Sequence, residues 1–199
     1  LPALTSIGPS VQKETVRNAI IAVVISSALI VLYLTMRFGF ALGGVKNGIK
    51  FGMSAIGALV HDVFVVLGVA AIIGYFAGWE ISALFITAML TVIGFSVHDT
   101  IVIFDRIREN LRKPIKGEDF GHLCNRSITQ SFARSINTSG TVIATLLILI
   151  FFGTATVDLK FFCLAMLMGI LSGTYSSIYN AAPILYLWDK ATIRSRGEE

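Results

Sequence analysis

The sequence predicts an all-α integral membrane protein built as a bundle of five transmembrane helices. Three observations support this prediction: 55% of the 199 residues are apolar, 14% are charged, and the mean hydropathy is +0.79. Soluble domains carry about 25% charged residues. A soluble fold of this size has no interior large enough to hide so much apolar surface, so lipid is the natural solvent for the excess.

Five apolar stretches are long enough to cross a bilayer core about 30 Å thick, which takes roughly 20 helical residues. Three of them contain no charged residue, and the second and third contain one each, Asp62 and Asp99. The bilayer core offers backbone groups no water partner, and nothing here alternates with the period of a barrel strand, so each stretch is predicted to be helical. In order, they occupy residues 19–36, 51–79, 81–104, 135–157 and 161–188.

Basic residues gather on one side of these spans. That side holds Arg37, Lys46, Lys50, Arg106, Arg108, Arg112, Lys113, Lys116, Arg126, Arg134, Lys190, Arg194 and Arg196, and the other holds Lys13, Arg17 and Lys160. The positive-inside rule places the richer side, and with it the C-terminus, in the cytoplasm. We therefore expect an external lead-in at 1–18, a transmembrane domain at 19–188 and a cytoplasmic tail at 189–199. The basic residues behind the net charge of +4 are therefore interpreted as signals of membrane orientation, and they do not indicate a nucleic-acid partner.

Three local patterns add detail. Residues 118–132 repeat apolar side chains at helical spacing, which is typical of an amphipathic helix that either lies on the membrane before the fourth span or docks a partner. Gly169 and Gly173 stand four apart and favour close helix packing. Pro183 predicts a kink near the end of the fifth span. The two cysteines, Cys124 and Cys163, are expected to be free thiols.

The second and third spans share a short motif. GALVHD ends at Asp62 and GFSVHD ends at Asp99, 37 residues later. Neighbouring antiparallel helices would place both His-Asp pairs inside the membrane. For His61, Asp62 and His98 the favoured interpretation is a structural hydrogen bond between helices.

Asp99 is the more informative of the two acids. An ionised carboxylate in hydrocarbon costs several kcal/mol unless it is paired or wetted. Its protonation then depends on its neighbours, and such a group can pass protons. Ser96, Asp99 and Ile103 share one helical face, which Arg106 continues toward the cytoplasm. His98 falls on another face, with Thr87, Thr91 and Gly94.

A polar stripe enters the fourth span. Arg134, Thr138, Thr141 and Thr145 follow at steps of four, three and four residues. Arg134 is a candidate partner for Asp99, because polar residues on a membrane helix face protein or water. The alternative is that Arg134 snorkels to the cytoplasmic surface as a topology anchor. The sequence leaves both open.

The run GFSVHDTIVIFDRIREN, residues 94–110, closely resembles the signature of the SecF branch of the SecD/SecF family, in the resistance-nodulation-division superfamily. Shorter segments at 7–11, 57–62, 134–139 and 173–179 also match, so the resemblance covers nearly the whole chain. The C-terminal end of this signature contains the remaining family-motif residues, which are Asp105, Arg106, Arg108, Glu109 and Asn110.

The resemblance implies half of a SecDF-type transporter core in the bacterial inner membrane. It implies SecD as a partner, separate or fused, together with the SecYEG channel and exported preproteins, and no cofactor. The family also has an earlier span and an external domain, which we expect to precede this sequence, since it opens at Leu1 without a methionine. Family members implicate the residues matching Asp99 and Arg134 in proton movement. The residues that we expect as possible support for this role are Asp62, His61, His98, Ser96 and Thr138.

Four functions follow from these observations. The first is a non-enzymatic accessory subunit that couples proton flow to late-stage protein export. The second is a structural scaffold that braces SecD and the channel, with the buried acids as interhelical contacts. The third is an intramembrane metalloenzyme using the two His-Asp pairs, which is disfavoured because a His-Glu-x-x-His helix is absent. The fourth is a drug exporter of the same superfamily, which the signature disfavours.

Overall fold

The computed structural model describes residues 9–41, 44–79, 82–153 and 156–196, and all regular structure within them is helical. Five helical segments are long and apolar enough to cross a membrane. This confirms the predicted fold class. The elements are α1 (Pro9–Ala41), α2 (Val45–Ala77), α3 (Ala83–Arg112), α4 (Phe120–Ile148), the π-helix η1 (Leu149–Gly153), α5 (Val157–Ser176), the π-helix η2 (Ser177–Ala181) and α6 (Ala182–Arg196).

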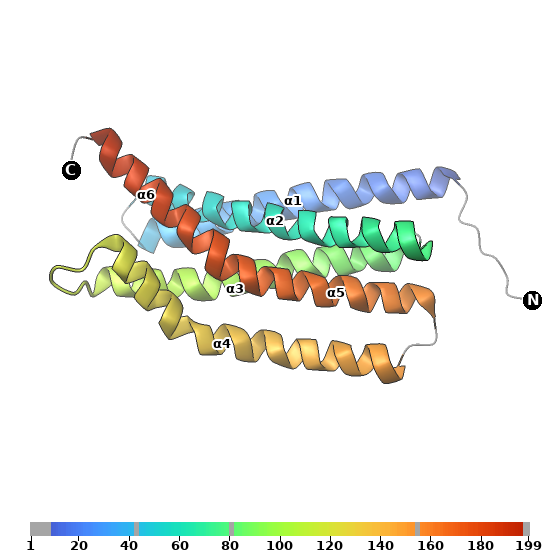
Figure 1. Ribbon diagram of the computed structural model, residues 1–199. Helices are drawn as coiled ribbons and strands as arrows, with labels where there is room; N and C mark the ends of the chain where they lie inside the picture. The colour runs from blue at the N-terminus through green and yellow to red at the C-terminus, as the bar shows by residue number, and fades with distance from the viewer. Residues whose placement is uncertain (1–8, 42–43, 80–81, 154–155, 197–199) are drawn as a thin grey trace, which may run out of the picture.

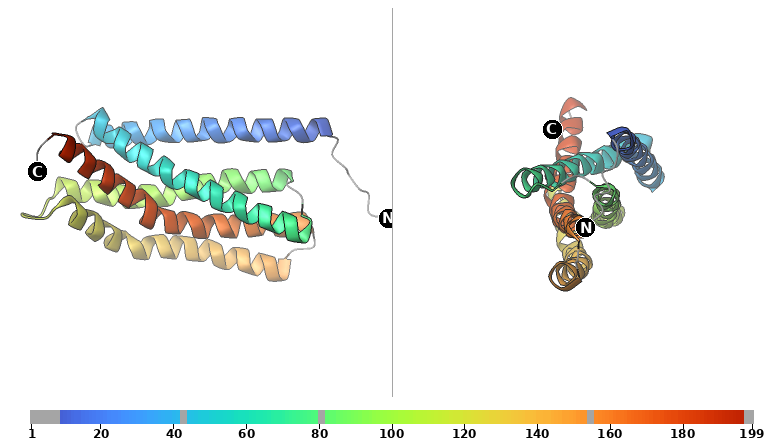
Figure 2. Two further views of the ribbon diagram at one scale, coloured as in Figure 1. Left: turned by 45° about the horizontal axis from the view of Figure 1, so that its top comes forward. Right: turned by 90° about the vertical axis from the view of Figure 1, so that its right-hand side faces the viewer.

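The spans lie side by side, with α1 at one edge of the bundle and α4 at the other (Figures 1 and 2). Between them, α5 packs against α2, α3 and α4. The end of α1, the start of α2 and the turn that connects α3 to α4 lie at one end of the bundle, together with α6 (Figure 1). We call this end, which carries most of the basic residues, the basic end.

Two helices extend further toward the basic end than the apolar stretches predicted. α3 continues to Arg112, and α4 begins at Phe120, where the Asp119 carboxylate accepts a 2.7 Å hydrogen bond from the His122 backbone N–H. The amphipathic pattern at 118–132 therefore belongs to α4 and is continuous with the fourth span. Its buried Leu123 and Cys124 join the bundle core, which explains why this segment packs on protein (Figure 1).

The last span changes direction near Pro183, as predicted. Proline has no N–H to donate to the carbonyl four residues earlier, and its ring crowds that carbonyl. The chain accommodates this by forming η2 just before Pro183, after which α6 leaves at an angle to α5 (Figure 1).

Three apolar clusters form the core of the bundle among the described residues, two large ones and a small one of Leu59, Ile93 and Val97. One large cluster lies toward the basic end and includes Phe38, Phe51 and Phe104, whose rings pack with centroids 4.8 to 6.0 Å apart. The other large cluster lies toward the opposite end, around Phe85 and Phe161. Asp62 and Asp99 fall between the two large clusters, each with 1% of its surface exposed.

Close contact between α3 and α5 depends on glycine. A Cβ at Gly169 would overlap the Val92 side chain, and a Cβ at Gly173 would lie 3.1 Å from the Ser96 Cβ. Lipid tails provide little hydrophobic drive between helices, so such backbone approach is a main source of packing energy in membranes. The predicted packing role of the two glycines is confirmed.

Candidate functional site between the two buried carboxylates

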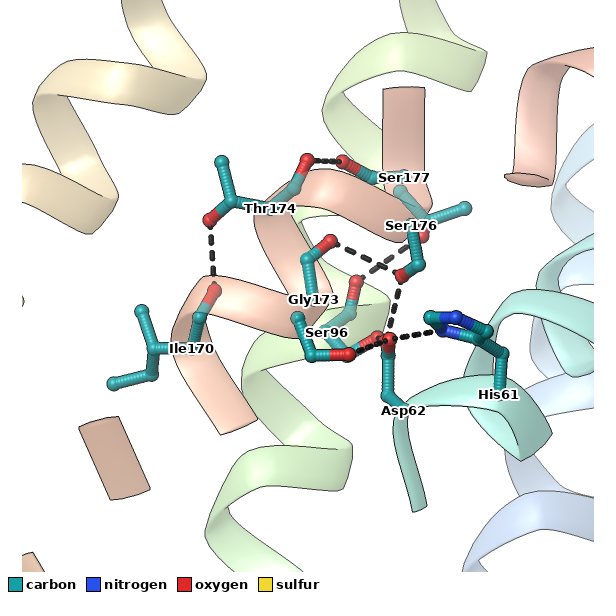
Figure 3. Close-up of polar contacts among 10 residues, drawn as sticks. His61, Asp62, Ser96, Ile170, Gly173, Thr174, Ser176 and Ser177 are labelled. Carbon is teal, nitrogen blue, oxygen red and sulfur yellow. Dashed lines mark hydrogen bonds and ion pairs between the residues drawn. The ribbon is translucent and has the colours of Figure 1, made fainter. Parts of the chain in front are cut away.

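Asp62, near the middle of α2, accepts hydrogen bonds from two neighbouring helices (Figure 3). Its Oδ2 accepts from Ser96 Oγ of α3 at 2.5 Å and from Ser176 Oγ of α5 at 2.7 Å. Its Oδ1 accepts from Ser172 Oγ at 2.7 Å and lies 3.1 Å from His61 Nδ1. Donors to the charged form reduce the cost of burying a carboxylate. Asp62 thus joins α2, α3 and α5 at one point.

Asp99, near the middle of α3, has a sparser set of neighbours. Ser177 Oγ, at the start of η2, lies 3.4 Å from its Oδ2 and also donates to the Thr174 carbonyl at 3.0 Å. Ser135 of α4 and Thr174 of α5 lie beside the carboxylate. The buried Ser135 Oγ has no hydrogen-bond partner among the described residues. Asp99 therefore sits among hydroxyl groups, and no cation contacts it within the part of the chain that the structure describes.

One segment of the fifth span contacts both acids. Ser172 and Ser176 face Asp62, whereas Thr174 and Ser177 face Asp99, because successive helical residues point about 100° apart. The segment ends where the π-helix begins. A displacement of this segment would change the hydrogen bonds of both carboxylates.

Arg134 does not contact Asp99 in the structure. Its residue is exposed, and the side chain has no ion pair among the described residues. The next residue, Ser135, faces Asp99. The Arg134 side chain therefore points about a quarter turn around α4 from the direction of Asp99. The predicted Arg134–Asp99 pair is therefore not formed within this chain.

The predicted polar stripe of the fourth span also points away from the bundle. Thr141 and Thr145 are exposed and Thr138 is half-buried, and each hydroxyl donates to a carbonyl of its own helix. The buried stripe of α4 consists instead of serines at four-residue steps, Ser127, Ser131, Ser135 and Ser139. Their regular spacing was a signal that the sequence analysis missed. Ser139 also contacts α5, through a 2.5 Å hydrogen bond to Thr174.

The two His-Asp pairs differ in their histidines. His61 is half-buried and reaches its neighbouring aspartate. His98 is exposed on the face it shares with Thr87, Thr91 and Gly94, as the helical spacing predicted. In the two His-Asp pairs, only the acids are buried. Ser172 and Thr174 were missed, since small hydroxyl residues in an apolar run read equally well as packing residues.

The signature residues at the end of α3 organise the basic end. Asp105 pairs with Arg37 of α1 at 3.3 Å and with Arg108 at 2.8 Å. Arg106 pairs with Glu109, three residues further along the helix, at 2.7 Å. These three pairs are partly exposed, so each contributes little to stability.

Asn110 holds α3 to α4 more firmly. Its buried amide donates to Ser127 Oγ at 2.8 Å and to Gln130 Oε1 at 3.1 Å, and its oxygen accepts from Arg126 at 3.1 Å. Arg126 in turn binds both Glu118 oxygens, at 2.8 and 2.6 Å. The hydrogen bonds from Arg126 lower the pKa of Glu118 below its usual value. The signature thus ties together two helices and their connecting loop.

Comparison with known proteins agrees with this architecture. The sequence profile described as "Protein export membrane protein SecD/SecF, C-terminal" matches residues 2–191. The chain belongs to the SecD/SecF family. This confirms the resemblance drawn from the signature at 94–110.

Named relatives of this SecD/SecF family member are translocase subunits. The protein translocase subunit SecF of Thermobaculum terrenum is 52% identical over 186 residues, which cover 93% of this chain and 56% of that protein. The protein translocase subunit SecDF of Bacillus subtilis is 39% identical, over 94% of this chain and 24% of that protein. The chain thus spans just over half the length of the SecF relative.

A solved structure has the same fold. The crystal structure of SecDF from Thermus thermophilus superposes with a TM-score of 0.79 at 38% identity, over 92% of this chain and 23% of that chain. The five spans and the names of the relatives make this a multi-pass bacterial membrane protein, and those relatives are named as subunits of a protein translocase. In both SecDF proteins the matched region is about a quarter of a longer chain.

Proposed function

We propose that this chain is a non-enzymatic subunit that couples proton flow to late-stage protein export, with Asp99 as its proton-carrying group. It works with SecD, the SecYEG channel and exported preproteins. The basic end faces the cytoplasm of the bacterial cell, at its inner membrane, and the C-terminus lies on that side. The positive-inside rule and the gathering of basic residues at one end of the bundle support this orientation.

The observation that carries the proposal is the hydroxyl environment of Asp99. A hydroxyl donates to a carboxylate and accepts from a carboxylic acid, so it can partner either protonation state. Ser177, Ser135 and Thr174 offer such hydroxyls to a carboxyl group that is 1% exposed. A fixed cation would instead hold the group in its charged form. The site therefore suits a carboxyl group that gains and loses a proton.

The neighbouring π-helix offers a way to convert protonation into movement. Ser177, which contacts Asp99, is the first residue of η2, and π-helical turns occur frequently at functional sites. Protonation of Asp99 changes its hydrogen bond to Ser177 and shifts the balance between two arrangements of α5 and α6. A membrane potential of 100 mV supplies about 2.3 kcal/mol per charge, which is enough to bias such an equilibrium.

Arg134 acts from outside the bundle in this proposal. Polar groups on a membrane span face protein or water, yet Arg134 and the threonines after it point away from the helices described here. We assign this stripe to the surface that meets SecD, where Arg134 is available to a proton pathway formed between the two halves.

The test is Asp99→Asn in the complete complex, with export measured in vesicles with and without a proton gradient. We expect the variant to lose the gradient-dependent part of export and to keep the gradient-independent part. Asp158→Asn, the same chemical change at the exposed start of α5, is the matched control and should behave as the parent does. If assembled Asp99→Asn complexes still respond to the gradient, the chain is the structural scaffold instead.

A further inference from the structure

The duplicated His-Asp motif has two different geometries. His61 Nδ1 lies 3.1 Å from Asp62 Oδ1, and the His61 side chain is 39% exposed while that of Asp62 is 1% exposed. A single contact thus connects the surface of the bundle with a buried carboxyl group. The equivalent His98 is exposed, and it has no hydrogen bond or ion pair to Asp99 among the described residues.

The hydrogen bonds of Asp62 leave little room for a ligand larger than a proton. An ionised carboxylate has about four acceptor positions. Ser96, Ser172, Ser176 and His61 occupy four, at 2.5 to 3.1 Å. These oxygens and the nitrogen already stand at hydrogen-bond distance from the carboxylate, so a metal ion could enter only by displacing them. Within the described chain, no group of three metal-ligating side chains forms here.

We propose that His61 and Asp62 form a second proton-exchange site, in which His61 takes up a proton at the bundle surface and passes it to the buried Asp62. The inference rests on the proposed proton coupling and extends it to a second carboxyl group. It assigns a function to the one His-Asp pair whose two members touch (Figure 3).

The transfer needs no other reactant. A proton that binds His61 Nε2 gives an imidazolium whose Nδ1–H donates to Asp62 Oδ1. Transfer breaks the Nδ1–H bond, leaves its electron pair on nitrogen and forms an O–H bond on Asp62. An ion pair becomes two neutral groups. The new O–H of Asp62 then donates to His61 Nδ1, whose freed electron pair accepts it.

Few other titratable groups face this pair. From α5, the Tyr175 ring lies 6.3 Å from the His61 ring, and Tyr179 of η2 stacks on Tyr175 at 4.9 Å. From α3, Ser96 contacts Asp62, and Asp99 follows one turn later. Neither α1 nor α6 places a charged side chain against the pair among the residues described.

The fifth span connects the proposed His61–Asp62 site to Asp99. Ser172 and Ser176 donate to Asp62, and the residue after Ser176 donates to Asp99. A proton on Asp62 removes the charge that strengthens these serine hydrogen bonds, and so weakens the hold on the same segment that contacts Asp99. In this arrangement the two carboxyl groups respond to each other through α5.

Infrared spectroscopy of the complete SecD-containing complex tests the site. Spectra are recorded across a pH series in the Asp99→Asn background, so that the carboxylic-acid band of Asp62 is measured whatever Asp99 does. We expect a band that rises with proton concentration and disappears in Asp62→Asn. His61→Gln should make the same band appear at about tenfold lower proton concentration, because the imidazolium charge no longer favours the carboxylate.

His98→Gln is the matched control, since it changes the other histidine of the duplicated motif and should leave the band in place. An unchanged band in His61→Gln would overturn the proposal, as would spectra in which Asp62→Asn removes nothing. Asp62→Asn has a further risk of misfolding, but His61→Gln decides the question without it. Failure of gradient-driven export to depend on Asp99 would refute the proposed function and leave these spectra unaffected.

Discussion

Gly173 places the backbone of α5 directly against α3. A Cβ at this position would lie 3.1 Å from the Ser96 Cβ and 3.2 Å from its Cα, and neither atom can move without moving the helix. Ser96 is also a donor to Asp62, so the close approach sets the geometry of that carboxylate. Gly173, which has no side chain, thus sets the position of Ser96 and, through Ser96, the hydrogen bonding of the Asp62 carboxylate.

Gly173→Ala should separate the two helices and lengthen the Ser96–Asp62 hydrogen bond. Overpacking of this kind typically costs about 1–3 kcal/mol, so we expect a lower unfolding temperature of the purified complex. Gly94→Ala is the control, because a Cβ there meets nothing within 4 Å. Equal unfolding temperatures for the two variants would show that α3 and α5 are not tightly packed at Gly173.

Burial of the two acids could be predicted from the sequence, but their partners could not. A lone acid in an apolar run must face protein, which correctly placed Asp62 and Asp99 inside. The sequence left open whether Arg134 pairs with Asp99 or snorkels to the cytoplasmic surface, and the pair is not formed among the residues that the structure describes. Ser135, one residue later, is in phase with Asp99, yet a serine among apolar residues carries too weak a signal to be selected.

The connection between α3 and α4 depends on charged and amide groups at its two ends. Arg126 bridges Glu118 of the loop and Asn110 of α3. The pKa of folded Glu118 lies below its ordinary value, so this contact stabilises the connection at any pH above that ordinary value. The contribution is lost as the pH falls through the lowered value and the carboxylate is protonated.

The protection of loop amides between α3 and α4 against hydrogen exchange, relative to the intrinsic rate at each pH, should therefore fall in acid. Glu118→Gln should exchange faster than the parent at neutral pH, and the difference should vanish once Glu118 of the parent is protonated. Glu109→Gln, which removes an exposed pair with Arg106, is the control and should leave loop exchange unchanged. A parent and a Glu118→Gln variant that exchange alike at neutral pH would contradict a role for this contact.

The existence and order of the spans followed from the sequence, whereas several helix limits did not. Apolar length predicts only the part of a helix that lies in hydrocarbon. α3 and α4 continue beyond it, because Asn110 and Asp119 satisfy polar groups where the helices leave the apolar layer. Pro183 predicted a break in the last span, but the π-helical form of that break depends on packing that no local pattern encodes.

At the scale of the whole molecule, the two edge helices bury little of themselves. In the most apolar stretch of each helix, 6% of the α1 stretch and 11% of the α4 stretch is buried by the rest of the chain. α1 exposes apolar side chains suited to lipid, whereas α4 exposes Arg134, Thr141 and Thr145. A bilayer does not favour the second surface without a protein or water neighbour.

A photo-reactive side chain in place of Thr141 should therefore cross-link to SecD in membranes. The same side chain in place of Phe64, an exposed apolar residue of α2, should react with lipid only. The products can be separated by mass on a denaturing gel. Lipid adducts alone at both positions would mean that the polar stripe of α4 does not meet SecD.

The π-helix η2 fits more residues into its turns than an α-helix does, which fixes the rotational phase of everything after it. Deleting one residue between 177 and 181 would remove the wide turn that accommodates Pro183 and would change the rotational phase of α6 relative to α5. Leu185 would leave the core, and Asp189 would lose its 2.7 Å ion pair with Lys50. Length variation in this stretch is therefore equivalent to turning the final helix.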